Sequence, residues 1–237
     1  MRQSLKKLRD RLQGTRPKIL DRAIPLAGLE AALCARYGYG LTVKCGDDAY
    51  FFHLPDIAED SCQSSLLKEK VFPDEELLLR LRRRTHQGMT ILEACAGFGA
   101  RAIFYAKSMR AGRVYALGGT ARNVSLSRKN ILLNDVDDVV QAHWLDSGEG
   151  RAQSGALDDF CRDQKINNVG LISLDESSLA FVSLESATEI LRKHGPAIII
   201  WGQWGAEAAK LRAFLDGLGY AEPEVWTPRI LFWMSRV

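Results

Sequence analysis

The sequence has few of the residues that build metal sites and disulfide frameworks. It contains four histidines and five cysteines among 237 residues, with no C-x-x-C pair and nothing that resembles H-E-x-x-H. An odd number of scattered cysteines favours buried thiols in a reducing compartment over a disulfide framework or a zinc site. We therefore expect no metal centre.

Long apolar runs are also missing. No stretch approaches the roughly 18 consecutive apolar residues that span a bilayer. Charges interrupt the N-terminus too early for the apolar core of a signal peptide. These two absences predict a cytoplasmic protein. The hydrophobic content of 46% is nevertheless high enough for a sizeable core and argues against a disordered chain.

The net charge of +3 is unevenly distributed along the chain. Residues 1–20 contain seven bases and one acid, which gives this segment +6 and leaves −3 for the rest. A negatively charged body argues against nucleic acid as a partner. The spacing of Leu5, Leu8 and Leu12 predicts a short basic helix with these three leucines on one face. That helix is either a docking surface for a membrane or protein partner or a solvated terminal helix.

From residue 89 the sequence alternates between strand and helix patterns. Helical patterns separate five predicted strands, which are Met89–Glu93, Arg113–Leu117, Val139–Trp144, Gly170–Asp175 and Ala197–Trp201. Residues 220–237 are too few for another crossover helix, so strands near Glu224–Trp226 and Ile230–Ser235 must form an antiparallel hairpin. The pattern predicts an α/β, Rossmann-like sheet that is mostly parallel, with helices on both faces and a C-terminal antiparallel hairpin.

The residues before this sheet predict a small N-terminal cap. Leu41–Cys45 and Tyr50–Leu54 are predicted strands around a turn, and a helix opens at Pro73–Glu76 and closes with arginines. The chain then has three parts, which are a basic segment over 1–20, the cap with its entry helix over 21–88, and the Rossmann-like domain over 89–237.

The first strand of the sheet ends in a glycine-rich turn. Glu93 is followed by Ala94-Cys95-Ala96-Gly97-Phe98-Gly99 and then by a helical run. Gly99 lets the backbone approach a ligand where the helix starts. A chain that binds a nucleoside here usually ends its second strand with Asp or Glu, whose carboxylate takes the ribose hydroxyls. This chain has Gly118-Gly119 instead.

Six local motifs occur in the order in which one enzyme family carries them. They are an entry helix at Val71–Leu78, a "vlDvGAniG"-like turn at Ile91–Gly99, a "GrVyAfEP"-like strand at Gly112–Leu117, a "kNielN"-like helix at Arg128–Asn134, "tLDdf" at Ala156–Phe160 and "iKiDvEG" at Ile172–Asp175. In these motifs the chain resembles the FkbM-type family of S-adenosylmethionine-dependent methyltransferases, over roughly residues 50–235. The parallel sheet with a terminal hairpin likewise resembles the class I methyltransferase fold.

The resemblance implies an S-adenosylmethionine cofactor and transfer of its methyl group to a hydroxyl, on a sugar or secondary metabolite. Such an acceptor would be a small molecule or a glycan. The resemblance implies cofactor-binding roles for Glu93, Gly97, Gly99, Gly118, Thr120 and Asp146. Thr120 would recover part of the lost ribose contact, and Asp146 would either approach the adenine amine or be solvated. Asp175 ends a strand at the ligand-binding edge of the sheet, and it or a nearby histidine would be the catalytic base.

The chain departs from the family at ligand-facing positions. Cys95 replaces the first glycine of the turn, Gly97 its asparagine, Gly118 the ribose-binding acid, and Ser177-Ser178 the Glu-Gly after Asp175. A hydrogen bond to a charged group contributes roughly 1.5–3 kcal/mol, so losing this carboxylate weakens binding by about 10²-fold. We expect weak or lost cofactor binding, and we expect the glycine at 118 to leave room for a restored side chain.

Three functions are compatible with these residues. The first is an active methyltransferase, and the second is a methyltransferase-like domain that has lost catalysis and serves as a binding or scaffold subunit. The third is a nicotinamide-dependent oxidoreductase, because Gly97–Ala102 fits G-x-G-x-x-A and Arg122 could meet a 2′-phosphate. The C-terminal hairpin disfavours the third. Trp201–Trp204, after the fifth strand, would line an acceptor pocket or pack as a lip, and packing is the favoured interpretation.

Overall fold

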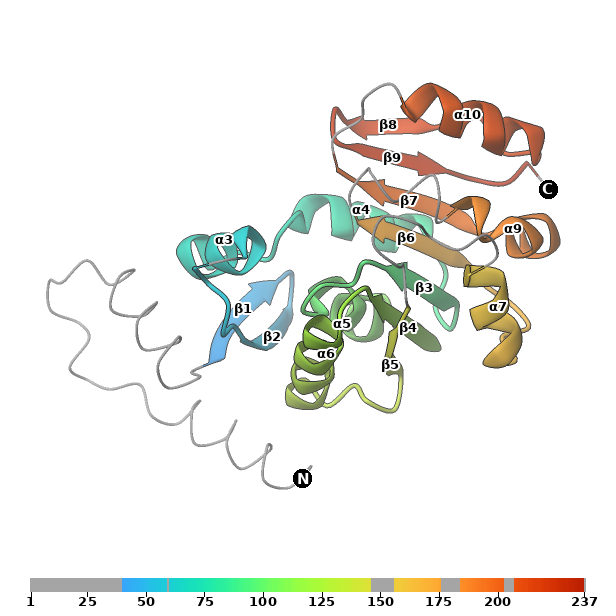
Figure 1. Ribbon diagram of the computed structural model, residues 1–237. Coiled ribbons are helices and arrows are strands. Elements are labelled where there is room, and N and C mark those ends of the chain that lie inside the picture. The colour runs from blue at the N-terminus through green and yellow to red at the C-terminus, as the bar shows by residue number, and fades with distance from the viewer. Residues whose placement is uncertain (1–39, 59, 146–155, 176–183, 203–206, 237) are drawn as a thin grey trace, which may run out of the picture. The chain divides into compact units, whose positions relative to one another are not determined.

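The computed structural model describes residues 40–58, 60–145, 156–175, 184–202 and 207–236. The chain forms two compact units. The first holds the described residues up to Thr85 together with Arg128–Asp137. The second holds His86–Ser127 and the described residues from Asp138 onward. Figure 1 labels the helices and strands of both units.

A seven-stranded sheet forms the centre of the second unit, with the strand order β5-β4-β3-β6-β7-β9-β8 (Figure 1). Five strands are parallel, namely β3 (Thr90–Ala94), β4 (Arg113–Gly118), β5 (Val140–Trp144), β6 (Leu171–Asp175) and β7 (Ala197–Trp201). β8 (Glu224–Thr227) and β9 (Ile230–Trp233) form an antiparallel hairpin, and β9 is also antiparallel to β7. The predicted sheet and its terminal hairpin are confirmed.

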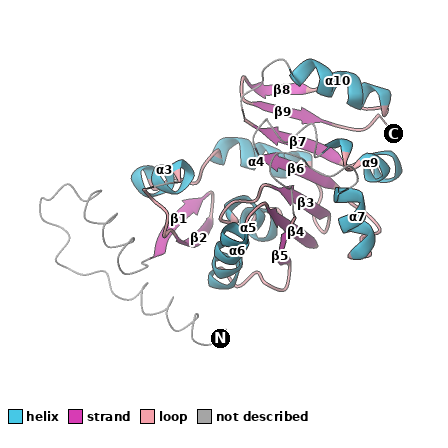
Figure 2. Cartoon of the chain, in the orientation of Figure 1, coloured by secondary structure: helices cyan, strands magenta, loops and turns pink. Residues whose placement is uncertain are grey.

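Helices cover both faces of this sheet (Figure 2). Apolar side chains of α7 (Ala156–Asp163), α9 (Thr188–His194) and α10 (Glu207–Gly217) form one core cluster with the sheet residues Leu92, Ile172 and Ile198. On the opposite face lies α5 (Ala100–Lys107), whose Tyr105 contacts Ser173 of β6. Among the helices in the described part of the chain, none is long and apolar enough to cross a membrane.

The first unit is built on a β-hairpin. β1 (Gly40–Cys45) and β2 (Asp48–His53) are antiparallel, and Gly46 takes a left-handed φ of 55° in the turn between them. α3 (Ser61–Glu69) begins at Asp60, whose carboxylate accepts from the backbone of its first turn. α4 (Glu75–Arg84) has acids in its first turn and arginines in its last. Both predicted strands and the entry helix are present, whereas α3 was not predicted.

Two asparagines complete the hydrogen bonding of β2. Asn130 lies in α6 (Ala121–Leu133), and Asn134 lies in the turn directly after it. Asn130 Oδ1 accepts from the N–H of His53 at 2.7 Å, and Asn134 Oδ1 accepts from the N–H of Phe51 at 3.0 Å. Asn134 Nδ2 donates to the carbonyl of Phe51 at 2.7 Å, and Asn130 Nδ2 donates to that of His53 at 3.4 Å. Each side-chain amide therefore binds both backbone groups of one strand residue.

The spacing of this pair explains why a helix can take the place of a neighbouring strand. Four residues of a helix rise about 6 Å, and two residues of a strand rise about 6.6 Å, so Asn130 and Asn134 stay in register with alternate residues of β2. An unpaired strand edge is prone to pair with another chain. The asparagines of the "kNielN"-like motif thus cover an edge of the hairpin, a role that the motif match did not predict.

The thiols differ in their exposure. Cys45 and Cys161 are buried, Cys95 is half-buried and Cys62 is exposed on α3, and all four are free. Burial raises the pKa of Cys45 to about 12 and that of Cys161 to about 12, which keeps both thiols protonated and unreactive. The expectation of buried thiols is wrong for Cys62, because it lies on the solvent side of its helix.

Candidate cofactor-binding site

The sheet has a topological switch point beside β3. This strand pairs with β4 on one side and with β6 on the other. The chain therefore builds the sheet outward from β3 in one direction through β4 and β5, and then in the other direction through β6 and β7. Ligands of open α/β sheets bind in the crevice at the carboxyl ends of such strands. The turn of residues 95–99 follows β3 at this edge, and β4 and β6 end there at Gly118 and Asp175.

The turn keeps the backbone of a glycine-rich loop although one glycine is replaced. Cys95, Gly97 and Gly99 have φ values of 63°, 53° and 88°, all in the left-handed region. A side chain disfavours this region by about 1–2 kcal/mol, so the rest of the turn must hold Cys95 there. The N–H of Ala96 donates to the carbonyl of Leu117 at 3.0 Å, which fixes the turn to the end of β4.

The two glycines of the turn have different surroundings. A Cβ atom added at Gly97 would meet nothing within 4 Å, so this glycine borders open space. A Cβ atom added at Gly99 would lie 2.5 Å from Oγ and 3.4 Å from Cα of Ser127 on α6. Gly99 is therefore required for the close packing of the start of α5 against α6. Gly97 is the position that leaves room for a ligand.

The space beside Gly118 is already filled. A Cβ atom at this position would lie 2.9 Å from Cγ2 of Val124 on α6 and 3.4 Å from the backbone nitrogen of Val124. The expectation that the glycine leaves room for a restored carboxylate is wrong. The reason is that the side chain of Val124 occupies that room, and this side chain is β-branched and therefore stiff at χ1.

Thr120 begins α6. Its Oγ1 accepts from the N–H of Asn123 at 3.1 Å, and its carbonyl accepts from the N–H of Val124 at 3.1 Å, which makes Thr120 the N-cap of the helix. Asp175 is the last residue of β6 and pairs with Trp201 of β7. Asp146 lies outside the described residues.

Glu93 lies in a buried polar cluster between the sheet and α5. Its side chain is 2% exposed, and its Oε1 lies 3.8 Å from Nε of Arg101 in the first turn of α5. The Arg101 guanidinium lies 4.9 Å from the centre of the Trp201 ring, in a cation–π contact. A buried carboxylate is strongly destabilising without a compensating charge, and here α5 supplies that charge.

Ser173 connects the remaining members of this cluster. Its hydroxyl lies 2.8 Å from that of Tyr105 and accepts from Nε1 of Trp201 at 3.1 Å. Burial is the main cause of a raised pKa for Tyr105, so its hydroxyl stays protonated at neutral pH. The indole of Trp201 is buried, which confirms the packing interpretation for this residue, while residues 203 and 204 lie outside the described part.

Arg101, Tyr105 and Ser173 were not among the predicted site residues. One signal for them was present in the sequence, because Arg101 lies in the first turn of the helix that follows Glu93 and the glycine-rich turn. That the two side chains meet depends on how α5 packs on the sheet, which the sequence does not specify.

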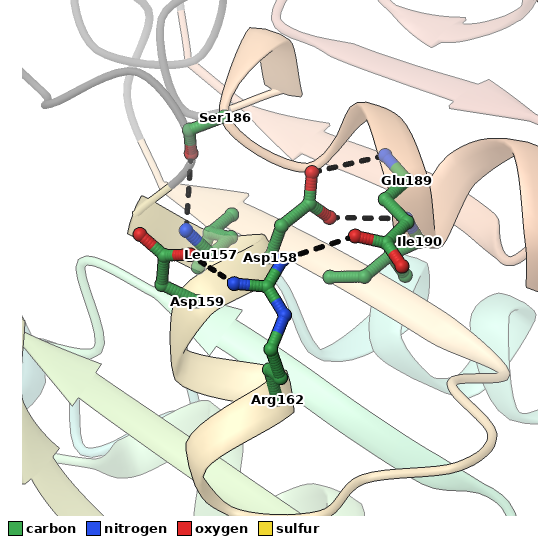
Figure 3. A network of polar contacts seen from close by, with 7 residues as sticks. All are labelled: Leu157, Asp158, Asp159, Arg162, Ser186, Glu189 and Ile190. Carbon is green, nitrogen blue, oxygen red and sulfur yellow. Dashed lines mark hydrogen bonds and ion pairs between the residues drawn. The ribbon is translucent and has the colours of Figure 1, made fainter.

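The "tLDdf"-like motif connects α7 to α9. Asp158 accepts from the N–H of Glu189 at 2.9 Å and from that of Ile190 at 3.0 Å, and so caps the start of α9 (Figure 3). The N–H of Leu157 donates to Oγ of Ser186 at 3.3 Å, and the N–H of Asp158 donates to the Ser186 carbonyl at 3.0 Å. The aspartate of the motif therefore has a structural role.

Arg162 of α7 makes two further ion pairs, one within α7 and one to α9. It contacts Asp159 at 2.6 Å and Glu189 at 3.1 Å (Figure 3). All three side chains are more than half exposed, and their charges are screened by water. The cap by the half-buried Asp158, rather than these ion pairs, accounts for the connection between the helices.

Comparison with known proteins supports the fold and leaves the family open. No family profile matches the chain, and no curated protein matches it in sequence. A putative rRNA methylase from Clostridium thermocellum matches with a TM-score of 0.51 and 16% identity, over 68% of this chain and 93% of that one. A protein of the NADB-Rossmann superfamily from Streptococcus agalactiae matches with a TM-score of 0.52 and 14% identity, over 67% of each chain.

At this level of identity the likeness establishes the fold alone. The chain has a Rossmann-like α/β fold with a mostly parallel sheet and a C-terminal antiparallel hairpin, as the sequence predicted. The narrower resemblance to the FkbM-type family stays a prediction. Function therefore has to be argued from the residues of the site.

Proposed function

We propose that the chain is an S-adenosylmethionine-dependent methyltransferase that acts on a hydroxyl of a sugar or secondary metabolite. The observation that carries this proposal is the turn at the switch point. It keeps three left-handed residues, at Cys95, Gly97 and Gly99, and it borders open space at Gly97. A backbone held in this shape beside a parallel sheet suits the close approach of a nucleoside-type ligand.

The residues of the site fit the cofactor in part. The backbone of the turn and the free space at Gly97 would hold its amino-acid portion. Gly118 offers no carboxylate to the ribose, and Val124 closes the space where one would stand. Glu93 is engaged by Arg101, so its contribution would be to fix the end of β3. These features predict that binding occurs and is weak for this fold.

The protein's part in such a transfer is mainly to position the acceptor. S-adenosylmethionine supplies a methyl group on a positively charged sulfur, which is already a good electrophile. Asp175 ends β6 beside the switch point, and we propose that its carboxylate takes the proton of the acceptor hydroxyl as the oxygen is methylated. The choice of a hydroxyl acceptor rests on the family resemblance described above.

A second candidate is a methyltransferase-like domain that has lost catalysis and acts as a binding or scaffold subunit. The packing of Val124 against Gly118 favours it, because Val124 fills the space of a ribose-binding side chain, and loss of the cofactor would permit that side chain to be lost. The basic segment of residues 1–20 would then serve as a docking element for a membrane surface or a protein partner.

Isothermal titration calorimetry separates these functions. The purified chain is titrated with S-adenosylhomocysteine and, in parallel, with NADPH. Binding of S-adenosylhomocysteine alone supports the methyltransferase, binding of NADPH alone indicates an oxidoreductase, and binding of neither favours the scaffold. With an acceptor in hand, Asp175→Asn should abolish transfer and leave S-adenosylhomocysteine affinity unchanged. Full activity of this variant would remove Asp175 as the base.

A further inference from the structure

The second half of α4 carries a cluster of exposed positive charge. Arg80, Arg82, Arg83 and Arg84 are all exposed, and residues 77–92 contain these four arginines and no acid. The helix dipole favours a base near the C-terminus, but this effect is confined to the last turn. Arg80 lies before that turn, which contains the other three arginines. The dipole therefore does not account for the whole cluster.

The contacts of α4 divide its surface into three sides. Leu78 and Leu81 are fully buried and form the side that packs on the core. Oε1 of Glu75 accepts from the N–H of Gly46 at 2.7 Å, so a second side faces the turn between β1 and β2. Arg82 follows Glu75 by close to two helical turns and therefore lies on this second side.

The third side of α4 faces solvent and carries Arg80, Arg83 and Arg84, which we call the arginine face. These residues have the i, i+3 and i+4 spacing that places side chains next to one another on a helix. The exposed Glu76 precedes them on the same side. Arg83 and Arg84 follow it by about 10–12 Å along the helix axis, which exceeds the Debye length of about 8 Å at physiological ionic strength. The end of α4 therefore presents positive charge that this acid does not neutralise.

The chemistry of the arginine face suits the head groups of anionic lipids. A cluster of roughly four to eight bases on an amphipathic helix is typical of binding to such head groups, and each base raises the affinity about fivefold. Single-stranded nucleic acid is instead bound by stacking on exposed aromatic side chains. The first unit exposes no aromatic side chain among its described residues. The net charge of −3 on residues 21–237 also disfavours a long polyanion that lies across the protein.

We propose that the arginine face of α4 is a docking surface for the anionic head groups of a lipid membrane. This inference is independent of the cofactor and of the proposed methyl transfer. Attraction to an anionic surface increases with the number of bases, so the +6 of residues 1–20 and the arginine face would act in the same direction. A defined site on a folded helix is thereby added to the docking element that the sequence offers at the N-terminus.

The test measures co-sedimentation of the full chain with lipid vesicles. One preparation contains equal parts of phosphatidylcholine and phosphatidylserine, and the other contains phosphatidylcholine alone. The variant Arg83→Gln/Arg84→Gln removes two charges from the arginine face. The control Arg192→Gln/Lys193→Gln removes two exposed charges from the last turn of α9, so it matches both the change in net charge and the position at a helix end.

A second pair, Arg80→Gln/Arg83→Gln, separates docking from stability. All the changed side chains are exposed, so each variant should melt close to the wild type. If one arginine pair melts at a lower temperature, vesicle binding by the other pair decides the outcome.

The wild type should bind the mixed vesicles, bind phosphatidylcholine alone much less, and lose binding as salt is raised, because salt screens the attraction. Each arginine pair should weaken binding to the mixed vesicles by about thirtyfold, which corresponds to about 2 kcal/mol. The α9 control should change this binding little.

Three results would overturn the docking surface. The first is a wild type that does not bind the mixed vesicles, or that binds phosphatidylcholine alone equally well. The second is vesicle binding that the arginine pairs leave unchanged or weaken no more than the α9 control does. The third is tighter binding of a single-stranded RNA oligonucleotide than of the mixed vesicles, lost in the arginine pairs, which would assign the face to nucleic acid instead.

Discussion

At the scale of single residues, the turn after β3 contains two glycines that are needed for different reasons. Gly97 and Gly99 both have left-handed φ values, but a Cβ atom would meet open space at the first and Ser127 at the second. Gly97→Ala should therefore lower the free energy of unfolding by about 1–2 kcal/mol, from backbone strain alone. Gly99→Ala should cost about 1–3 kcal/mol more, because the added methyl overpacks the contact with α6. Urea denaturation of both variants measures the difference.

A double variant controls this comparison. Ser127→Ala removes the oxygen that lies closest to the added methyl, and should recover part of the loss caused by Gly99→Ala. The same change should not help Gly97→Ala. If both glycine variants were equally destabilised and neither responded to Ser127→Ala, packing against α6 would not be the reason for Gly99.

The residue at 118 carries a second prediction. Gly118→Glu should lower the free energy of unfolding by about 1–3 kcal/mol or more. Its Cβ would overlap with Val124, and its carboxylate would be introduced at a buried position. It should not tighten S-adenosylhomocysteine binding by itself. Thermal melts and calorimetry on the same samples give both readouts.

The matched control is Gly118→Glu combined with Val124→Ala. Removing the two methyl groups of Val124 opens the space that the new side chain needs, so the double variant should be more stable than the two single losses added together predict. A single Gly118→Glu variant as stable as the wild type would show that Val124 moves aside freely, and the glycine would then have no packing role.

At the scale of elements, the strand edge of β2 depends on two side chains of one helix. Asn134→Ala leaves the N–H and carbonyl of Phe51 without their partner in a buried position. The expected loss is about 1–3 kcal/mol of unfolding free energy, the cost of leaving a buried polar group unpaired. Hydrogen exchange at the Phe51 amide should accelerate in the folded state, which distinguishes loss of this contact from general destabilisation.

Asn123→Ala serves as the control on the same helix. It makes the same chemical change near the start of α6, and alanine has the higher helix propensity, so its stability should be equal or slightly higher. Equal effects of Asn123→Ala and Asn134→Ala on the Phe51 amide would contradict the role of Asn134 at the strand edge.

The connection between α7 and α9 gives a prediction with an adjacent control. Asp158→Ala removes an N-cap that accepts from two backbone N–H groups of α9, and should lower stability by about 1–2 kcal/mol. Asp159→Ala removes only an exposed ion pair with Arg162 and should change the melting temperature little. Chemical denaturation of the two variants side by side tests this. A larger effect of Asp159 than of Asp158 would show that the ion pairs hold the helices.

The elements also show what a sequence can predict. The strands of the sheet were predictable because apolar runs such as Ala197–Trp201 are buried on both faces of the sheet. The observed ends of the strands differ from the predicted ends by two residues at most. α3 was missed, since its helical pattern is short and rich in serine. The filling of the space at Gly118 depends on where α6 places Val124, and such a contact between distant residues leaves no local pattern.

At the scale of the whole molecule, the two units are interleaved in sequence. The predicted boundary lies between residues 88 and 89, and the chain first passes from one unit to the other between Thr85 and His86, after which Arg128–Asp137 returns to the first unit. Those residues carry both asparagines that bind β2. The first unit is therefore not a continuous segment of the chain, and cutting at the predicted boundary removes part of its hydrogen bonding.

This interleaving predicts how fragments behave. A fragment of residues 1–88 lacks Asn130 and Asn134, leaves the edge of β2 open and should show no cooperative thermal transition by circular dichroism, whereas the full chain should. Adding a peptide of residues 119–137 in excess should restore strand signal to the fragment, and the same peptide with Asn130→Ala and Asn134→Ala should not. A fragment that unfolds cooperatively on its own, with no response to either peptide, would show that the hairpin is stable without the helix.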